Sequence, residues 1–244
     1  MKILVIGAGN MGLTYAEGMS KSKLLKKKNI MVLDNSEEKL EALNEISHFD
    51  AFKELGDCVP KADIIFIAVK PYHAENLFKA LKSFTKPGQV LVSIMAGVNI
   101  DNIKKYVTSP EVSRIEKLTV ESLLDTTGKS MEVTSEKFID ASTGISGSGP
   151  AYVFYFMQSM MEAALKMGFS KNDSTVLVSQ TFTGAVELFN QSNLSPNSWM
   201  ERVASKGGTT RAALDSMQDN NVNELIKDAA FAAFNRAVEL GKEH

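Results

Sequence analysis

Three glycines near the N-terminus have the types and spacing of a phosphate-binding turn. Gly7, Gly9 and Gly12 follow directly after residues 3–6, an apolar run typical of a strand buried on both faces of a parallel sheet. The first glycine permits a tight bend, the second lets the backbone approach a pyrophosphate, and the third lets the next helix lie close to the strand. Residues 11–22 fit that helix, whose free N–H groups would face the phosphates. A glycine-rich turn without a ligand is the alternative, and the strand-turn-helix setting argues against it.

A second candidate is the acid at the end of the next strand. Residues 30–34 form an apolar run that ends in Asp34, and a helix is predicted over residues 37–46. An acid in this place accepts a hydrogen bond from a ribose 2′-hydroxyl and repels the 2′-phosphate of NADPH. Neither Asn35 nor Ser36 is an arginine that would offset the repulsion, so these residues by themselves favour NADH. The alternative is that Asp34 only shapes the turn or caps the helix.

Two further buried strands are predicted over residues 63–69 and 89–94, with a helix ending at Leu81 between them. Strands that alternate with helices in this way predict a doubly wound, mainly parallel sheet, in which ligands bind beyond the carboxyl ends of the strands. In the loop after the first of these strands, Pro71 fixes the backbone, so the loop's shape should matter more than the charge of Lys70. The residues expected to contact the cofactor are Gly7, Gly9, Asn10, Met11, Gly12, Asp34, Asn35, Ser36, Ala68, Val69, Lys70, Pro71, Ala96 and Gly97.

The stretch after Gly97 contains an unusual junction. The pattern predicts a helix over residues 99–106, a strand over 111–115, a helix over 116–127 and a strand over 130–133. No Gly, Pro, Asn or Asp lies between the strand that ends at residue 115 and the helix that follows it. A strand would therefore become a helix without a connecting loop.

From about residue 135 the pattern changes to apolar positions spaced three and four apart, which is typical of helices. Helices are predicted over residues 151–167, 170–191 and 221–240. We therefore expect two domains: a Rossmann-like α/β dinucleotide-binding domain over residues 1–134 and an all-helical domain over residues 135–244. The aromatic residues of the helical domain would pack either against a partner subunit or in a monomer core; they include Phe154, Phe156, Phe231 and Phe234.

A glycine-rich connection in the helical domain is a candidate anion site. Gly207 and Gly208 leave backbone N–H groups uncovered, Thr209 could cap the helix that follows, and the start of that helix carries partial positive charge suited to a carboxylate. An ordinary glycine linker with a threonine cap explains the same residues. The chemistry alone leaves both interpretations open.

Composition restricts the classes of function. The 244 residues carry a net charge of -2, which argues against a nucleic-acid or anionic-membrane partner. The single cysteine, Cys58, excludes an intramolecular disulfide, and the three histidines His48, His73 and His244 show no metal-ligand spacing. No signal-peptide pattern and no apolar run of membrane-spanning length is present, so we expect a cytoplasmic protein.

Five stretches in this order and spacing resemble the pyrroline-5-carboxylate reductase family. They are residues 6–12 (IGAGNMG), 68–71 (AVKP), 93–97 (SIMAG), 146–152 (SGSGPAY) and 205–210 (SKGGTT). The resemblance implies reduction of 1-pyrroline-5-carboxylate to L-proline by NADPH or NADH, the last step of proline biosynthesis. It also implies a homodimer built by intertwined helical domains, which in the family is often assembled further into a decamer. The residues that would hold the substrate carboxylate are Gly207, Gly208, Thr209 and Thr210.

The chain departs from the family pattern in two places. Members usually continue the strand that matches residues 112–114 into a Met-Pro-Asn-Thr-Pro segment and a hairpin, and this sequence has neither. The second departure is Asp34, because the family commonly uses NADPH.

No residue stands out as a general acid, and a cyclic imine that is protonated in solvent would not require one. A related imine reductase or a β-hydroxyacid dehydrogenase remains an alternative; the latter would use a lysine of the helical domain, for which Lys166 is the candidate. A nicotinamide-binding regulatory protein without catalysis is a further alternative, favoured by the absent segment.

Overall fold

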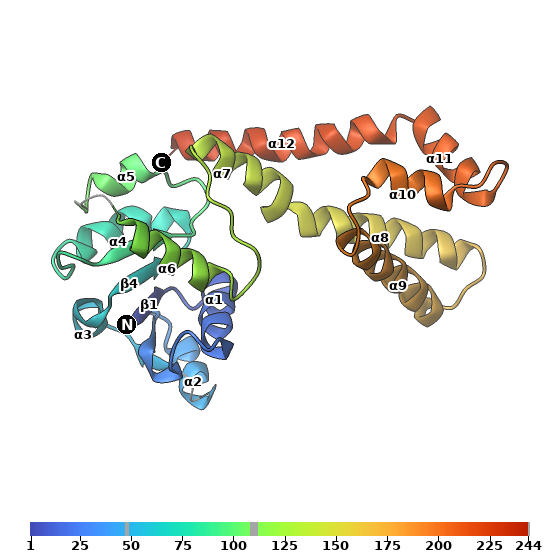
Figure 1. Ribbon diagram of the computed structural model, residues 1–244. Helices are drawn as coiled ribbons and strands as arrows, with labels where there is room; N and C mark the ends of the chain where they lie inside the picture. Colours follow the sequence, from blue (N-terminus) through green and yellow to red (C-terminus); the bar gives the residue numbers. More distant parts are fainter. Residues whose placement is uncertain (47–48, 108–111, 244) are drawn as a thin grey trace. The chain divides into compact units, whose positions relative to one another are not determined.

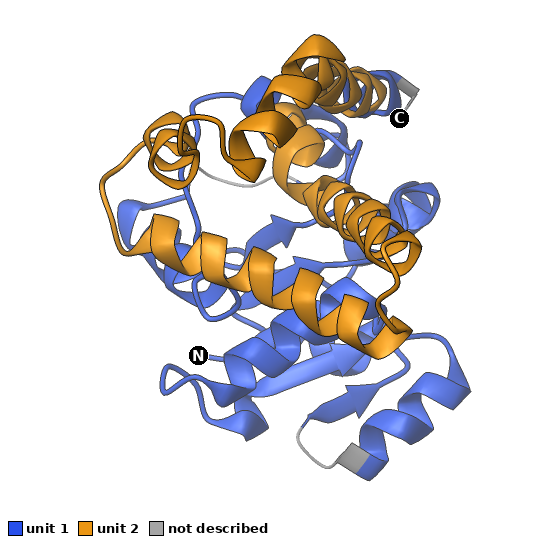
Figure 2. Ribbon diagram, turned by 90° about the vertical axis from the view of Figure 1, so that its right-hand side faces the viewer, with its two compact units in different colours: residues 1–139, 237–244 blue, residues 140–236 orange. Residues whose placement is uncertain are grey.

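The computed structural model describes residues 1–46, 49–107 and 112–243, which form two compact units (Figures 1 and 2). The first unit contains residues 1–139 and 237–244, and the second contains residues 140–236. The sequence placed the boundary at residue 134 and assigned the whole last helix to the second domain. The contacts instead group the end of that helix with the first unit.

A five-stranded parallel sheet forms the centre of the first unit, with the strand order β3-β2-β1-β4-β5. Adjacent strands are in register, with Ile3 opposite both Ile30 and Ile64. This arrangement confirms the doubly wound parallel sheet. The strands are β1 (Ile3–Ile6), β2 (Ile30–Leu33), β3 (Asp50–Phe52), β4 (Ile64–Ile67) and β5 (Val90–Ser93). The sequence analysis missed β3, which has only three residues and none of them fully buried.

Helices cover both faces of this sheet. Alternation along β1 sends Ile3 and Val5 to the face covered by α1, α2 and α6, and Leu4 and Ile6 to the face covered by α3, α4 and the segment after α5. Side chains buried this completely contribute about 1.5–3 kcal/mol each. The helices are α1 (Asn10–Lys21), α2 (Glu37–Ile46), α3 (Leu55–Cys58), α4 (Ala74–Leu81), α5 (Ile100–Lys104) and α6 (Arg114–Leu124), with single turns η1 (Lys27–Asn29), η2 (Val59–Lys61) and η3 (Pro71–His73).

Cys58 is fully buried in the core on the face of the sheet that α3 and α4 cover. Burial raises the pKa of its thiol to about 11, so the side chain is a neutral, small apolar group at ordinary pH.

The strand predicted over residues 111–115 is wrong, because residues 112–115 form no strand. Glu111, the first residue of that prediction, lies outside the described residues. Ser113 is the N-cap of α6: its Oγ accepts from the N–H of Glu116 at 3.3 Å, while the Glu116 carboxylate accepts from the N–H of Ser113 at 2.7 Å. This reciprocal capping box begins the helix without any Gly, Pro, Asn or Asp, and it explains the missing loop. The strand predicted over residues 130–133 is also wrong, because that stretch is irregular.

The second unit is helical, as predicted. The three expected helices correspond to α8 (Gly149–Lys166), α9 (Lys171–Asn190) and α12 (Val222–Glu243), and α8 packs against α9. The other elements are α7 (Glu136–Ser142), a single π-helical turn η4 (Thr143–Gly147), α10 (Pro196–Val203) and α11 (Thr209–Asp219). The sequence analysis missed α10, although Ser195 and Pro196 form a typical N-cap and first residue. Within the described residues, no helix is both long and apolar enough to cross a membrane.

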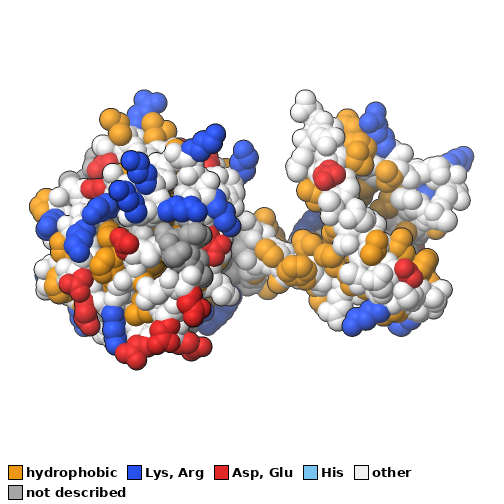
Figure 3. Space-filling view, turned by 90° about the horizontal axis from the view of Figure 1, so that it is seen from below, with side chains coloured by type: hydrophobic (Ala, Val, Ile, Leu, Met, Phe, Trp, Pro, Cys, Tyr) orange, Lys and Arg blue, Asp and Glu red, His pale blue; other side chains and the backbone are white. Residues whose placement is uncertain are grey.

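Few residues of the second unit are buried. In residues 140–236, all of which the structure describes, only Gly144, Ser174, Val178 and Ala204 are buried. Large apolar side chains lie on its surface instead; they include Phe154, Tyr155, Leu177, Phe189 and Phe231. Figure 3 shows apolar side chains in orange on one face of this unit.

Candidate functional site

The glycine loop between β1 and α1 has the geometry that its sequence predicts. Gly7 has φ +109°, and a Cβ there would lie 2.8 Å from the Ala68 carbonyl oxygen. A Cβ on Gly12 would overlap the Gly7 carbonyl oxygen. At Gly9, by contrast, a Cβ would have no described atom within 4 Å. Two glycines are therefore required by the fold, and the third leaves open space in front of the loop.

The start of α1 completes an anion-receptive surface. Gly9 is the N-cap residue, and its carbonyl accepts from the N–H of Leu13 at 2.9 Å. Among the described residues, no side chain caps this helix and its first turn carries no acid. The first-turn N–H groups, which include those of the exposed Asn10 and Met11, are therefore available to a phosphate. The open space at Gly9 and these N–H groups together fit a dinucleotide pyrophosphate.

The loops that follow β1 and β4 are adjacent because these two strands are neighbours in the sheet. After β1 the chain continues to β2 on one side, and after β4 it continues to β5 on the other side, so the two loops diverge at this point of the sheet. The Ala68 N–H donates to the Ile6 carbonyl at 2.8 Å, and the Ile94 N–H donates to the Ile67 carbonyl at 3.1 Å. The carboxyl edge of the sheet therefore brings the glycine loop together with the predicted residues Ala68, Val69, Lys70, Pro71, Ala96 and Gly97. Lys70 is exposed and directly precedes η3.

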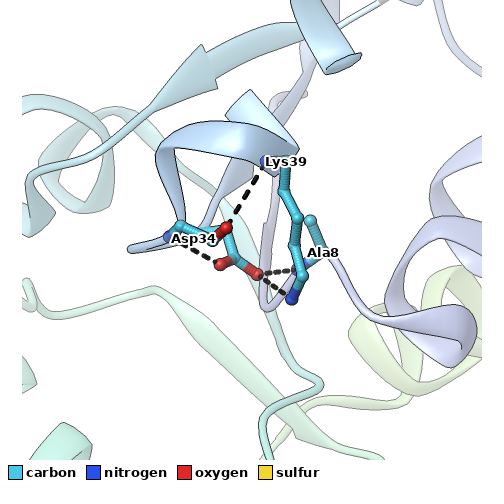
Figure 4. A network of polar contacts seen from close by, with 4 residues as sticks. Ala8, Asp34 and Lys39 are labelled. Atoms are coloured by element: carbon cyan, nitrogen blue, oxygen red, sulfur yellow. Dashed lines mark hydrogen bonds and ion pairs between the residues drawn. The ribbon is translucent and has the colours of Figure 1, made fainter. Parts of the chain in front are cut away.

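Asp34, directly after β2, is buried and bound to the chain itself (Figure 4). Its Oδ2 accepts from the Ala8 N–H at 2.7 Å and from the Lys39 Nζ at 3.2 Å, and its Oδ1 accepts from the Ser36 N–H at 3.0 Å. Burial acts to raise the pKa of Asp34, but these N–H donors and the Lys39 charge outweigh it and lower the pKa. Asp34 is therefore an ionised residue that shapes the turn and ties β2 to the glycine loop.

Lys39 was missed by the sequence analysis, which examined only Asn35 and Ser36 for a cation beside Asp34. The lysine is the third residue of α2, and its side chain reaches back over the first turn to the carboxylate. Its position five residues after a strand-end acid, at the start of the next helix, was the signal in the sequence that could have identified it.

The glycine connection of the second unit differs from expectation in its cap. Gly207 has φ +72°, and the Gly208 N–H donates to the Ser205 carbonyl at 3.0 Å. Gly208, not Thr209, is the N-cap of α11, and no described side chain caps this helix. The prediction that Thr209 caps the helix is wrong, because Thr209 is already its first residue. The first-turn N–H groups and the Thr209 hydroxyl at this exposed end are therefore available to an anion.

The turn that leads into the motif at residues 146–152 packs against the last helix of the unit. Tyr152 donates from its hydroxyl to the Gly144 carbonyl at 2.9 Å, which holds η4 against the first turn of α8. A Cβ on Gly144 would lie 3.0 Å from the Phe234 backbone nitrogen, so α12 approaches this turn closely. In this stretch the Tyr152 hydroxyl therefore positions the backbone of the turn.

The described residues contain no cluster of three or more His, Cys, Asp or Glu side chains that could hold a metal ion. Lys166, the candidate acid of the dehydrogenase alternative, is exposed and is the last residue of α8.

Two family models match the chain. Residues 136–240 match the model described as pyrroline-5-carboxylate reductase dimerisation, and residues 2–97 match the model described as NADP oxidoreductase coenzyme F420-dependent. Between these two matches lie residues 98–135, the stretch that contains the unusual junction.

Relatives of this chain are similar over nearly the whole length. It is 30% identical to a pyrroline-5-carboxylate reductase of Pseudomonas aeruginosa over 268 residues, covering 99% of this chain and 97% of the relative. It is 29% identical to pyrroline-5-carboxylate reductase 2 of Bacillus subtilis, covering 99% of this chain and 96% of the relative. Both alignments span 268 positions, more than the 244 residues of this chain, so each relative has residues without a counterpart here.

Solved structures agree with this result. A pyrroline-5-carboxylate reductase from Coxiella burnetii matches with a TM-score of 0.91 and 28% identity over 98% of both chains. A pyrroline carboxylate reductase from Plasmodium falciparum with NADP bound matches with a TM-score of 0.88 and 27% identity, over 99% of this chain and 98% of that one. Because the chain is 30% identical to the Pseudomonas aeruginosa relative over nearly the whole length of both, and its residues 136–240 match the dimerisation model of the same family, it belongs to the pyrroline-5-carboxylate reductase family.

Proposed function

We propose that this chain reduces 1-pyrroline-5-carboxylate to L-proline with a nicotinamide dinucleotide as hydride donor. The observation that carries the proposal is that one chain contains two anion-receptive helix starts of different kinds. The first, at Gly9, follows a buried strand of a parallel sheet, and the second, at Gly208, follows a glycine pair. The first suits a dinucleotide and the second suits a carboxylate.

The loops at the carboxyl edge of the sheet would hold the cofactor. Gly7, Gly9 and Gly12 would admit the pyrophosphate, with the N–H groups of Asn10 and Met11 directed to it. The remaining contacts would come from the turn after β2 and the loops after β4 and β5, namely Asp34, Asn35, Ser36, Ala68, Val69, Lys70, Pro71, Ala96 and Gly97. The cofactor is NADPH or NADH, and it would supply the hydride for the C=N carbon.

Gly207, Gly208, Thr209 and Thr210 would hold the substrate carboxylate. Unpaired N–H groups and a threonine hydroxyl orient a carboxylate by hydrogen bonds that are stronger than neutral ones. Such positioning can supply most of the rate acceleration when the imine is already protonated. The proposal therefore needs no side chain as general acid.

The apolar surface of the second unit supports a homodimer, and the family resemblance extends the proposal to a decamer built from such dimers. Exposed aromatic residues on α8, α9 and α12 would be covered by the same surface of a second copy. The match of residues 136–240 to a dimerisation model supports the same proposal.

The test is to incubate the purified protein with pyrroline-5-carboxylate and either NADPH or NADH, and to measure cofactor oxidation and proline. Formation of proline supports the proposal, and the ratio of the two rates gives the cofactor preference. Cofactor binding without proline formation would contradict it and favour the regulatory alternative, for which the residues absent relative to the family provide the rationale.

A further inference from the structure

We propose that Lys39 is the residue that lets this chain accept the 2′-phosphate of NADPH in spite of the acid at the end of β2. The inference rests on the proposed use of a nicotinamide dinucleotide and names the residue that sets its specificity. It starts from the ion pair between Lys39 Nζ and Asp34 Oδ2 at 3.2 Å.

Asp34 has little capacity left for a ribose hydroxyl. A carboxylate offers about four acceptor positions, and the chain fills three of them, with the N–H groups of Ala8 and Ser36 and the Lys39 ammonium. Both positions on Oδ2 are used. The acid is also buried, with 6% of its surface exposed. Its main role is therefore to fix the turn, and not to select a free 2′-hydroxyl.

Lys39 also removes the electrostatic argument against NADPH. Its charge lies next to that of Asp34, so the pair is neutral as seen from a ligand. Asp34 therefore repels a 2′-phosphate much less than an unpaired acid would. The sequence-based preference for NADH depended on that repulsion.

Lys39 is placed to bind the phosphate directly. An ammonium has three N–H donors, and the contact with Asp34 uses one of them. Its side chain is 48% exposed, while Asp34 lies beneath it. The neighbouring acid Glu37 is already paired with Lys53 at 2.6 Å, which limits its repulsion of a phosphate.

The experiment compares binding of NADPH and NADH, measured by nicotinamide fluorescence without substrate, in Lys39→Met and Lys39→Arg. Lys39→Met should raise the Kd for NADPH about tenfold and leave the Kd for NADH within about twofold, because only the phosphate loses a charged partner. Lys39→Arg should keep the affinity for NADPH, since it keeps the charge and the donors.

Lys21→Met is the matched control, because it removes the same charge from an exposed ion pair, with Glu17, at the end of α1 away from the glycine loop, and should change neither Kd. An equal loss of NADPH and NADH affinity in Lys39→Met would overturn the inference, since Lys39 would then only hold Asp34 in place. Unchanged NADPH affinity would overturn it as well.

The two proposals fail in different ways. If the unsubstituted protein binds both cofactors and the lysine variant shows no selective loss, the inference on Lys39 fails and the proposed reaction stands. If the selective loss is seen and no proline forms, the reaction fails and the inference stands. If the unsubstituted protein binds neither cofactor, both are wrong.

Discussion

The two units of this protein treat their apolar residues in opposite ways. In the first unit, all four β1 side chains are buried, and helices cover both faces of the sheet. In residues 140–236 only four residues are buried, and aromatic side chains such as Tyr155, at 74% exposed, lie on the surface. The first unit thus contains its own core, whereas the helices of the second have an apolar surface of the kind that another subunit covers.

The largest effect that this comparison predicts is on assembly. Tyr155→Glu would place a charge in the proposed dimer interface, where an unpaired carboxylate costs several kcal/mol, so a dimer should dissociate to monomers at micromolar concentration. Tyr72→Glu is the matched control, since Tyr72 is 70% exposed but lies in the first unit. Sedimentation velocity measures both. If the unsubstituted protein is a monomer, or if the two variants behave alike, the apolar surface of the second unit is not a dimer interface.

The next effect concerns two glycines of the same loop. Gly12→Ala would push a Cβ into the Gly7 carbonyl oxygen and should destabilise the first unit by about 2–3 kcal/mol. Gly9→Ala meets no described atom within 4 Å, so it should leave stability nearly unchanged but weaken NADPH binding at least about tenfold by filling the pyrophosphate space.

Chemical unfolding and NADPH titration distinguish the two glycine variants, with Gly128→Ala as a control at an open position. The single tryptophan, Trp199, lies in α10 and reports only on the second unit. Gly12→Ala should therefore shift the circular dichroism transition more than the Trp199 fluorescence transition. Coincident shifts would mean that the units do not unfold separately.

The same contrast explains what could be predicted from the sequence. Local patterns were enough to predict four of the strands, β1, β2, β4 and β5, because each is a short apolar run with glycine or a polar residue near its end. The glycine loop was predicted from the spacing of its glycines directly after β1. The first two residues of α6, Arg114 and Ile115, were predicted as the end of a strand, with the helix beginning at residue 116, because the search for a loop residue overlooked Ser113 and Glu116 as a capping box. The three-residue β3 has too few residues to show a pattern.

The site was predicted less completely than the fold, since its charges depend on three-dimensional proximity. The position of Asp34 after β2 was predicted correctly, but the contacts with Ala8 and Lys39 were not. A lysine on the next helix becomes part of the site only because the first turn of α2 carries it back to the strand end. In the same way, Thr209 was expected as a cap, whereas the turn at Gly207 makes Gly208 the N-cap.

A smaller effect is expected from the substrate end. Thr209→Ala removes a hydroxyl that would bind the substrate carboxylate and should raise the KM for pyrroline-5-carboxylate about tenfold, with the KM for NADPH nearly unchanged. Thr175→Ala, at an exposed position of α9, should change neither KM. Steady-state kinetics with each substrate varied in turn measures both values. A parallel rise in the two Michaelis constants of Thr209→Ala would remove this residue from the substrate site.

The smallest effect is a difference in acid sensitivity between buried and exposed carboxylates of the first unit. The folded pKa of Asp34 is below its ordinary value of 3.8, so its ionised form stabilises the fold above that value and the contribution is lost as pH falls through the folded pKa. Asp34→Asn should therefore lower the unfolding midpoint most at neutral pH, and the deficit should shrink toward about pH 3 and below.

Glu37→Gln is the control, because the Glu37 carboxylate and its partner Lys53 are both exposed and should add little to stability at any pH. Urea unfolding followed by circular dichroism measures the first unit together with the second, and Trp199 fluorescence isolates the second. A pH-independent deficit in Asp34→Asn would mean that the lost contribution comes from packing around the turn, and not from the carboxylate charge that joins β2 to the glycine loop.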